Sequence, residues 1–365
     1  GIIDSGIDYT HSMFGGVGTE QAYKDIKPGE ATALFPSAKV VGGLDFVGTD
    51  YDSGAVDFNK RLPIVDGNPL DEGGHGTHVA GTVAGHGDGV STYDGVAPDA
   101  SLYALKVFGA DGSTNDSVVV AAMEYAADPN GDGDTSDRLD VVNLSLGSGY
   151  GDGHILYTEA IQNLSRSGTV VVCSGGNSGD TPYIVGSPGV ADDEISVAAS
   201  VDDMDQNWKF RAAKFTTVDD PEIYTEAIEG AITKPLSEIQ SLVGELFYAG
   251  LADQDFTPET AAALNGHIAL IDRGGVSFAD KIRRSEAAGA IAVVVVNSQD
   301  DAPFVMGGGD GEKFGIPGVM ISKVLGIKLK AALGQGTVHA DLTTVKKIEK
   351  PELVDTITSF SSRGP

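Results

Sequence analysis

The segment 73–85, GGHGTHVAGTVAG, places His75 and His78 three residues apart among glycines and other small residues. An imidazole in such a segment can act as a general base, which takes a proton from an attacking group in a hydrolase. Asp4, in GIIDSGID, follows an apolar run and precedes a turn sequence. An aspartate at the end of a buried strand can orient a histidine and stabilise its charged form, although aspartates also precede turns for turn formation alone. Together the residues predict acid–base chemistry that still requires a nucleophile.

A zinc site is not favoured for the two histidines. The zinc-protease pattern H-E-x-x-H needs a longer spacing and a glutamate, and HGTH has neither. His75 and His78 lie near the same face of a predicted helix. We expect His75 to be the base and His78 to be a packed structural residue.

Short apolar runs alternate with helical segments over residues 1–204. Gly1 to Ile3 resemble the tail of a buried strand, and further strands with near-continuous apolar character are predicted at 101–108, 140–147, 168–177 and 195–200. Helices are predicted at 75–86, 115–127 (with Asn115 or Asp116 as cap) and 153–166. This alternation predicts an α/β fold, a parallel sheet with helices on both faces. Active sites of such sheets gather at the carboxyl ends of the strands.

Residues 205–347 differ in character from the rest of the chain. They hold the only tryptophan, Trp208, and most of the Lys and Arg. They contain a strand–helix–strand unit of their own, GHIALIDRG, SFADKIRRSEAAGA and IAVVVVNS, followed by IPGVMIS and KVLGIKLKAALG. The glycine cluster MGGGDGEKFGIP is not a phosphate loop, because no Lys-Ser/Thr pair opens a helix there. We expect a small β-rich α+β domain inserted at 205–347 into a first domain formed by 1–204 and 348–365.

Composition narrows the classes of function. The chain has 365 residues, 41% of them hydrophobic, and a formal net charge of −29; outside 205–347 there are 10 basic and 34 acidic side chains. A field of that sign repels nucleic acid and anionic membranes and favours bound cations or a salty medium. No apolar run approaches the roughly 18 residues of a membrane-spanning helix. The single cysteine, Cys173, excludes an internal disulfide framework. We therefore expect no nucleic-acid partner and no membrane segment.

Four motifs occur in an order that identifies a family. DSGID, HGTHVAGTVAG, VVNLSLGSG and SGGNSG, with TSFSSRGP at 358–365, resemble the motifs of subtilisin-like serine proteases, the subtilases (peptidase S8 type). The resemblance implies an endopeptidase that cleaves polypeptides with a Ser-His-Asp triad, in which Asp4 is the aspartate and His75 the base. It also implies a secreted or cell-surface protein. The motifs specify neither the cleavage-site preference nor an oligomeric state.

The same resemblance implies the groups that hold the substrate. Asn177 falls where the family keeps its oxyanion-hole amide, a neutral donor that stabilises a tetrahedral oxyanion without adding charge. Two segments match the strands that pair with the substrate backbone and wall the specificity pocket: Ser145, Leu146, Gly147 and Ser174, Gly175, Gly176. The region 205–347 resembles the protease-associated (PA) domain of some large secreted subtilases. That likeness implies a lid or substrate-selecting module, and a spacer without substrate contact is an equal alternative.

The segment 128–137, DPNGDGDTSD, is similar to a calcium-binding loop. Positions 1, 3, 5 and 7 of the pattern are held by Asp128, Asn130, Asp132 and Asp134, with Gly133 at position 6. Position 12 is Leu139 instead of glutamate, so Asp137 or Asp140 has to substitute and the loop is not an EF-hand proper. Crowded carboxylates repel one another without a cation. We expect structural Ca²⁺ here and no organic cofactor; the alternative is an acidic solvated loop.

The nucleophile is the missing part of the triad. In the family the serine follows the histidine, in a Gly-Thr-Ser motif that opens a helix, and SFSSRGP lies upstream of it. After residue 347 the serines are Ser359, Ser361 and Ser362, and none stands in such a motif. We expect the serine to lie beyond Pro365, and the chain to be a fragment cut at both ends that is inactive alone. The alternative is a noncatalytic, peptide-binding pseudoprotease that retains the groove.

Overall fold

The computed structural model describes the chain except for residues 88–92, 154–155, 180, 300–301, 308–312 and 365. The chain divides into two compact units, Gly1–Ala198 with Ser361–Pro365, and Ala199–Phe360. We expected an inserted domain at 205–347; the second unit begins before this range, at Ala199, and ends after it, at Phe360.

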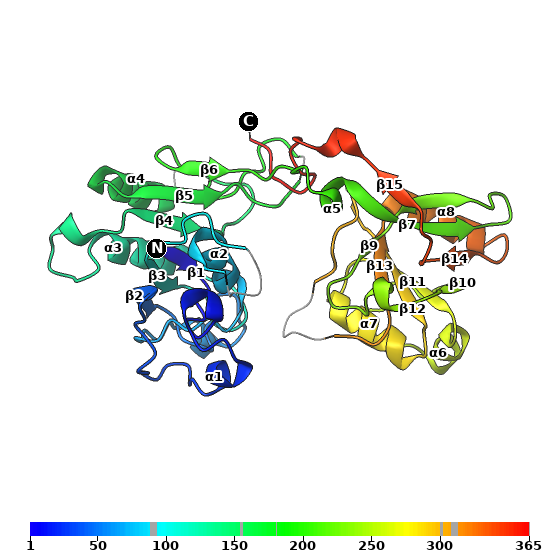
Figure 1. The fold of residues 1–365 in the computed structure, drawn as a ribbon, viewed down its shortest axis with the longest axis horizontal. Helices are drawn as coiled ribbons and strands as arrows, with labels where there is room; N and C mark the ends of the chain where they lie inside the picture. Colours follow the sequence, from blue (N-terminus) through cyan, green and yellow to red (C-terminus); the bar gives the residue numbers. More distant parts are fainter. Residues whose placement is uncertain (88–92, 154–155, 180, 300–301, 308–312, 365) are drawn as a thin grey trace. The chain divides into compact units, whose positions relative to one another are not determined.

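A six-stranded parallel sheet forms the centre of the first unit (Figure 1). The strand order is β2-β3-β1-β4-β5-β6. The strands are β1 (Ile2–Asp4), β2 (Val40–Asp45), β3 (Leu102–Lys106), β4 (Val141–Leu144), β5 (Val170–Ser174) and β6 (Ile195–Val197). Every neighbouring pair is parallel, as the α/β alternation predicts. Strand β2 was not predicted, because two glycines in VVGGLD interrupt its apolar pattern.

The predicted helices of the first unit are present, with small shifts at their ends. They are α2 (His75–Ala84), α3 (Asp116–Ala127) and α4 (Leu156–Ser167), beside the short α1 (Glu20–Lys24) and 3-10 turns at Ser12–Phe14, Phe58–Arg61 and Thr135–Asp137. Asn115 caps α3, since its side-chain oxygen accepts a hydrogen bond from Val118 N at 3.1 Å. The expected start of α4 near 153 includes residues 154–155, which lie outside the described residues.

Helices cover both faces of this sheet. Ile3 of β1 packs in one apolar cluster with residues of α3 and α4, whereas its neighbour Ile2 packs in another with Ala80 and Ala84 of α2. Successive strand residues point to opposite faces, so a buried run such as Ile2–Asp4 requires cover on both sides. The fold class predicted from the sequence is therefore confirmed. Among the described residues, no helix has the length and apolar character needed to cross a lipid bilayer.

The second unit contains a mixed nine-stranded sheet. Its strands are β7 (Lys209–Thr216), β8 (Ile223–Glu226), β9 (Ile228–Glu229), β10 (Val243–Tyr248), β11 (Ile268–Asp272), β12 (Ala292–Val296), β13 (Gly318–Ile321), β14 (His339–Asp341) and β15 (Lys347–Glu349). The helices are α5 (Asp205–Trp208), α6 (Pro258–Leu264), α7 (Phe278–Ala287) and α8 (Lys323–Leu333), with 3-10 turns at Leu236–Glu238 and Pro351–Leu353. The expected strand–helix–strand unit is β11–α7–β12, and α8 follows β13. Strand β10 pairs in parallel with β11 and antiparallel with β14. The pairs β13–β9, β14–β7, β15–β7 and β7–β8 are also antiparallel, a pattern that the sequence did not reveal.

Candidate active site

Asp4 and His75 are in direct contact. Asp4 is the last residue of β1 and is 1% exposed, and His75 is the first residue of α2. The distance from His75 Nδ1 to Asp4 Oδ1 is 2.7 Å, within the 2.6–3.2 Å that acid–base partners need. The same oxygen accepts a hydrogen bond from Ser5 N at 2.8 Å. A buried carboxylate thus fixes one ring nitrogen of His75 and leaves the other for chemistry.

The surroundings of His75 favour its charged form. The hydrogen bond to Asp4 raises the pKa of His75, partial burial opposes the shift, and the negative charges of Asp4 and Asp71 add to it. The His75 side chain is nevertheless 61% exposed and can be reached by a substrate. A base that is stabilised once it has accepted a proton suits a reaction in which an imidazolium forms in the transition state.

Asp71 holds the start of α2 against the turn after β1, a role that the sequence analysis missed. This carboxylate is 2% exposed. Its oxygens accept hydrogen bonds from Ser5 Oγ (2.8 Å), Gly73 N (2.9 Å), Gly74 N (2.8 Å), Thr77 N (2.8 Å) and Thr77 Oγ1 (2.6 Å). The first backbone N–H groups of a helix lack partners within the helix and favour negative charge. An acidic residue just before a predicted helix was the available signal.

A buried ion cluster anchors the residue next to Asp71. Lys106, at the end of β3, places its Nζ 3.0 Å from Asp45 Oδ2 and 2.7 Å from Glu72 Oε2. The side chains of Lys106 and Asp45 are each 1% exposed. Burial disfavours the ammonium group, but the two carboxylates outweigh burial and raise the pKa of Lys106. The cluster therefore ties the loop before His75 to β2 and β3.

The expectation that His78 is a packed structural residue is wrong. His78 is exposed. With His11, Phe14 and Thr82 it lines a cavity beside α2. The buried face of α2 consists of Gly76, Ala80 and Ala84. At about 100° per residue, position 78 lies roughly 200° around the helix from Gly76, on the opposite side. The face of α2 that meets the sheet carries the small residues Gly76, Ala80 and Ala84, with Val79 and Val83 packed beside them.

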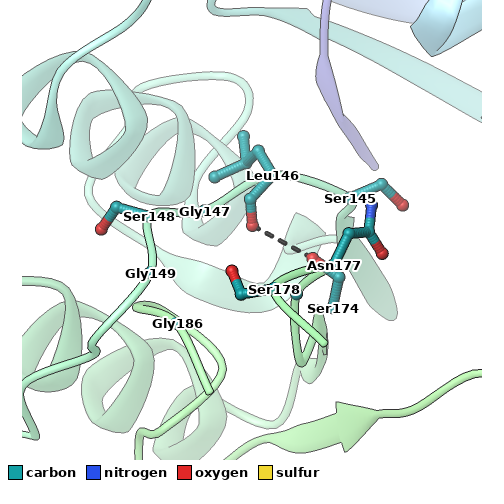
Figure 2. Close-up of a pocket in the computed structure, with 10 residues that line it drawn as sticks. Ser145, Leu146, Gly147, Ser148, Gly149, Ser174, Asn177, Ser178 and Gly186 are labelled. Atoms are coloured by element: carbon teal, nitrogen blue, oxygen red, sulfur yellow. Dashed lines mark hydrogen bonds between the residues drawn. The ribbon is translucent and has the colours of Figure 1, made fainter. Parts of the chain in front are cut away.

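The predicted substrate-binding segments line one cavity of about 300 Å³ (Figure 2). Its lining consists of Ser145, Leu146, Gly147, Ser148, Gly149, Ser174, Gly176, Asn177, Ser178 and Gly186. Ser174 Oγ donates a hydrogen bond to Leu146 O at 3.2 Å across it. Gly175 was predicted to contact the substrate but does not line the cavity. It is buried, and its N–H donates a hydrogen bond to Val197 O of β6 at 2.9 Å. Four lining residues were not predicted: Ser148, Gly149, Ser178 and Gly186.

Asn177 is exposed, and its side-chain amide has no hydrogen-bond partner within the described part of the chain. The cavity lining includes Asn177 but neither Asp4 nor His75. All three belong to the same edge of the sheet, because Asp4 ends β1 and the cavity residues follow β4 and β5, its successive neighbours in strand order. An unengaged amide donor at this edge can bind an oxyanion.

Residues 1–365 match the sequence profile of the subtilase family. The chain belongs to this family. The subtilase chain is 33% identical over 368 residues to the minor extracellular protease Vpr of Bacillus subtilis (strain 168), a match that covers 100% of this chain and 38% of that protein. It is 36% identical over 209 residues to subtilisin DY of Bacillus licheniformis, covering 56% of this chain and 64% of that protein.

Among solved structures, the subtilisin-like protease Apa1 of Pseudoalteromonas sp. AS-11 matches with a TM-score of 0.40 and 20% identity. That match covers 97% of this subtilase chain and 77% of the other. The chain spans less than two thirds of the length of Vpr and of subtilisin DY.

The acidic loop of this subtilase turns its oxygens toward its own backbone. Asp128 accepts hydrogen bonds from the N–H groups of Gly131, Asp132 and Gly133, at 2.8, 3.2 and 2.7 Å. The expected ligands Asn130, Asp132, Asp134 and Asp137 each accept one bond of this kind. Within the described ranges no group of three or more His, Cys, Asp or Glu side chains is arranged to hold a metal ion. The donors are hard oxygens, which suit Ca²⁺, but they do not surround one point.

Proposed function

We propose that this subtilase chain is part of a secreted serine endopeptidase that hydrolyses peptide bonds of polypeptides. The observation that carries the proposal is the 2.7 Å contact between His75 Nδ1 and Asp4 Oδ1 at the carboxyl edge of a parallel sheet. A histidine fixed at Nδ1 by a buried carboxylate is the general base of a serine nucleophile. The location outside the cell rests on the relatives, since Vpr is described as an extracellular protease.

In this proposal His75 Nε2 takes the proton of the serine hydroxyl as its oxygen attacks the scissile carbonyl carbon. Asp4 keeps the proton on Nδ1 and stabilises the imidazolium that forms. Asn177 donates a hydrogen bond to the oxyanion, while the segments 145–147 and 174–176 hold the substrate backbone. His75 then gives its proton to the leaving amine, and water releases the acyl group by the same steps in reverse.

The serine itself is proposed to lie beyond Pro365, in a Gly-Thr-Ser motif of the full-length protein. The coding sequence after Pro365 discriminates between the protease and the alternative, a pseudoprotease that binds peptides through the cavity of Figure 2. We further propose that the unit Ala199–Phe360 is a PA domain, acting as a lid, a substrate-selecting module or a spacer.

The function is tested by expressing the full-length protein and residues 1–365 separately and assaying both on casein. We expect the full-length protein to cleave casein and to be blocked by phenylmethanesulfonyl fluoride, and residues 1–365 to be inert because they supply base, carboxylate and oxyanion donor but no attacking oxygen. Inhibitor-sensitive cleavage by residues 1–365 would mean that the nucleophile lies within them. An inert full-length protein that carries an intact Gly-Thr-Ser motif would favour the pseudoprotease.

Calcium binding to the loop 128–137 is a separate proposal, supported by the crowding of its carboxylates. Asp128 and Asp132 can keep their backbone hydrogen bonds on coordination, because a carboxylate has two oxygens and about four lone pairs. We expect millimolar Ca²⁺ to raise the melting temperature of the protein, because a ligand that binds only the folded state stabilises it. The shift should vanish in Asp132→Ala. An absent shift, or the same shift in the variant, would count against the site.

A further inference from the structure

The segment after the second unit returns to the loop that carries Asn177. Ser362 is 6% exposed, and its N–H donates a hydrogen bond to Gly176 O at 3.0 Å. Its Oγ accepts a hydrogen bond from Ser178 N at 3.1 Å. One serine, 184 residues away in sequence from Ser178, therefore binds the backbone on both sides of Asn177. We call this pair of hydrogen bonds the Ser362 bracket.

The Ser362 bracket adds two hydrogen bonds to a loop, residues 175–178, that is already hydrogen-bonded at Gly175. Gly175 N donates to Val197 O at 2.9 Å, and Gly175 O accepts from Gly186 N at 3.2 Å. Beyond Gly175 the backbone contacts of Ser362 hold the next two peptide units. Ser362 is itself tied to its surroundings, because the adjacent Arg363 O accepts a hydrogen bond from Ile184 N at 3.2 Å. The loop is thus fixed at both ends and Asn177 lies between.

The Ser362 bracket requires glycine at position 176, for its backbone conformation and for lack of space. Its φ angle is +102°, a conformation that side chains disfavour, and a Cβ there would lie 2.9 Å from Ser362 Oγ. Glycine at 176 therefore permits both the turn of the loop and the close approach of the Ser362 hydroxyl. The absence of a side chain at Gly176 is therefore what allows Ser362 to pack against this loop.

We propose that Ser362 is a positioning residue for the oxyanion donor, acting through the backbone of Gly176 and Ser178 to hold the Asn177 amide in place. The inference rests on the proposed protease function. An oxyanion donor works only when it is placed in advance at the site where charge develops, and small displacements of reacting groups are costly. Without the Ser362 hydroxyl, Ser178 N–H loses its acceptor and the loop around Asn177 relaxes.

The test uses Ser362→Ala, Asn177→Ala and the double variant in the full-length protein, with a peptide substrate. We expect Ser362→Ala to lower kcat by about 10-fold or more with little change in KM, as for an interaction formed only in the transition state. In the Asn177→Ala background it should lower kcat no further, because the donor that it positions is already absent. Deuterium exchange at Ser178 N–H should accelerate in Ser362→Ala.

Thr169→Val is the matched control. It removes another buried hydroxyl-to-backbone hydrogen bond of the first unit, from Thr169 Oγ1 to Leu139 O at 2.7 Å, and should leave kcat unchanged. Should Ser362→Ala fail to fold, Ser362→Cys replaces it: the thiol is of similar size but a weak acceptor, so a lowered kcat is expected again.

The outcomes separate this inference from the proposed function. An active wild-type protein with wild-type kcat in the folded Ser362 variant overturns the role of Ser362 and leaves the protease intact. An equal loss of kcat with and without Asn177 also overturns it, because Ser362 then acts by another route. An inert wild-type protein overturns the protease and, with it, the positioning role.

Discussion

Replacing His75 by alanine in the full-length protein is expected to lower kcat for peptide hydrolysis by about 10⁴-fold or more, the order found when a serine protease triad loses its base or the base loses its orientation. Without the imidazole no group is in place to take the serine proton or to return it to the leaving amine. The measurement is kcat and KM on a chromogenic peptide. His78→Ala is the matched control, because His78 lies three residues away on the same helix, is exposed and should leave kcat unchanged.

Asp4→Asn extends the same prediction to pH. The hydrogen bond that His75 donates to Asp4 is the main cause of the raised pKa of His75, and the base works only when neutral. In the wild-type protein the acid limb of the kcat/KM profile should therefore lie at a higher pH than the pKa of an unperturbed histidine would give. The asparagine variant should lose most of kcat, and its residual acid limb should move to lower pH. An unmoved limb would mean that another group controls the profile.

Lys106→Met is expected to destabilise the first unit by about 3–5 kcal/mol, the cost of removing one partner from a buried ion pair. The variant leaves the carboxylate of Asp45, 1% exposed, and that of Glu72 without their cation. Since Trp208 lies in the second unit, its fluorescence is a poor reporter here. The measurement is native-state deuterium exchange of the amides in β3.

Lys24→Met is the control for this change. Lys24 also contacts a carboxylate, that of Glu20, but both side chains are largely exposed, so its loss should hardly alter exchange in β3. Equal effects of the two substitutions would contradict the view that Lys106, Asp45 and Glu72 form a stabilising cluster. Because Glu72 adjoins Asp71, we also expect Lys106→Met to weaken catalysis in the fraction that remains folded.

The sequence predicted the parts of the site that depend on local pattern. Buried apolar runs predicted β3 to β6, and the run of small residues after His75 predicted α2. These patterns are local, since each involves only a few consecutive residues. Asp4 stands at the end of a predicted strand, where a carboxylate can orient a histidine, and the resemblance of the motifs to those of subtilases paired it with His75. Asn177 was assigned through the resemblance of SGGNSG to the subtilase motif, and the structure places it after β5, in the lining of the cavity.

Other features depend on contacts that no local pattern encodes. The Ser362 bracket joins residues 184 positions apart, and the Lys106 cluster joins β2, β3 and the loop before α2. His78 is exposed because Gly76, Ala80 and Ala84 lie on the opposite face of α2, which packs against the sheet. The spacing H-x-x-H by itself does not indicate which face of the helix is buried. In the acidic loop, backbone N–H groups donate hydrogen bonds to the carboxylates, and composition alone does not reveal these contacts.

The most direct test of the proposed protease is to find the serine that phenylmethanesulfonyl fluoride modifies in the full-length protein. The reagent transfers its sulfonyl group to an activated serine oxygen with loss of hydrogen fluoride, and digestion with mass spectrometry locates the adduct. We predict one adduct, on a Gly-Thr-Ser serine after Pro365, formed in parallel with loss of casein cleavage and absent in His75→Ala. An adduct on a serine within residues 1–365, or cleavage that persists without any adduct, would contradict the account.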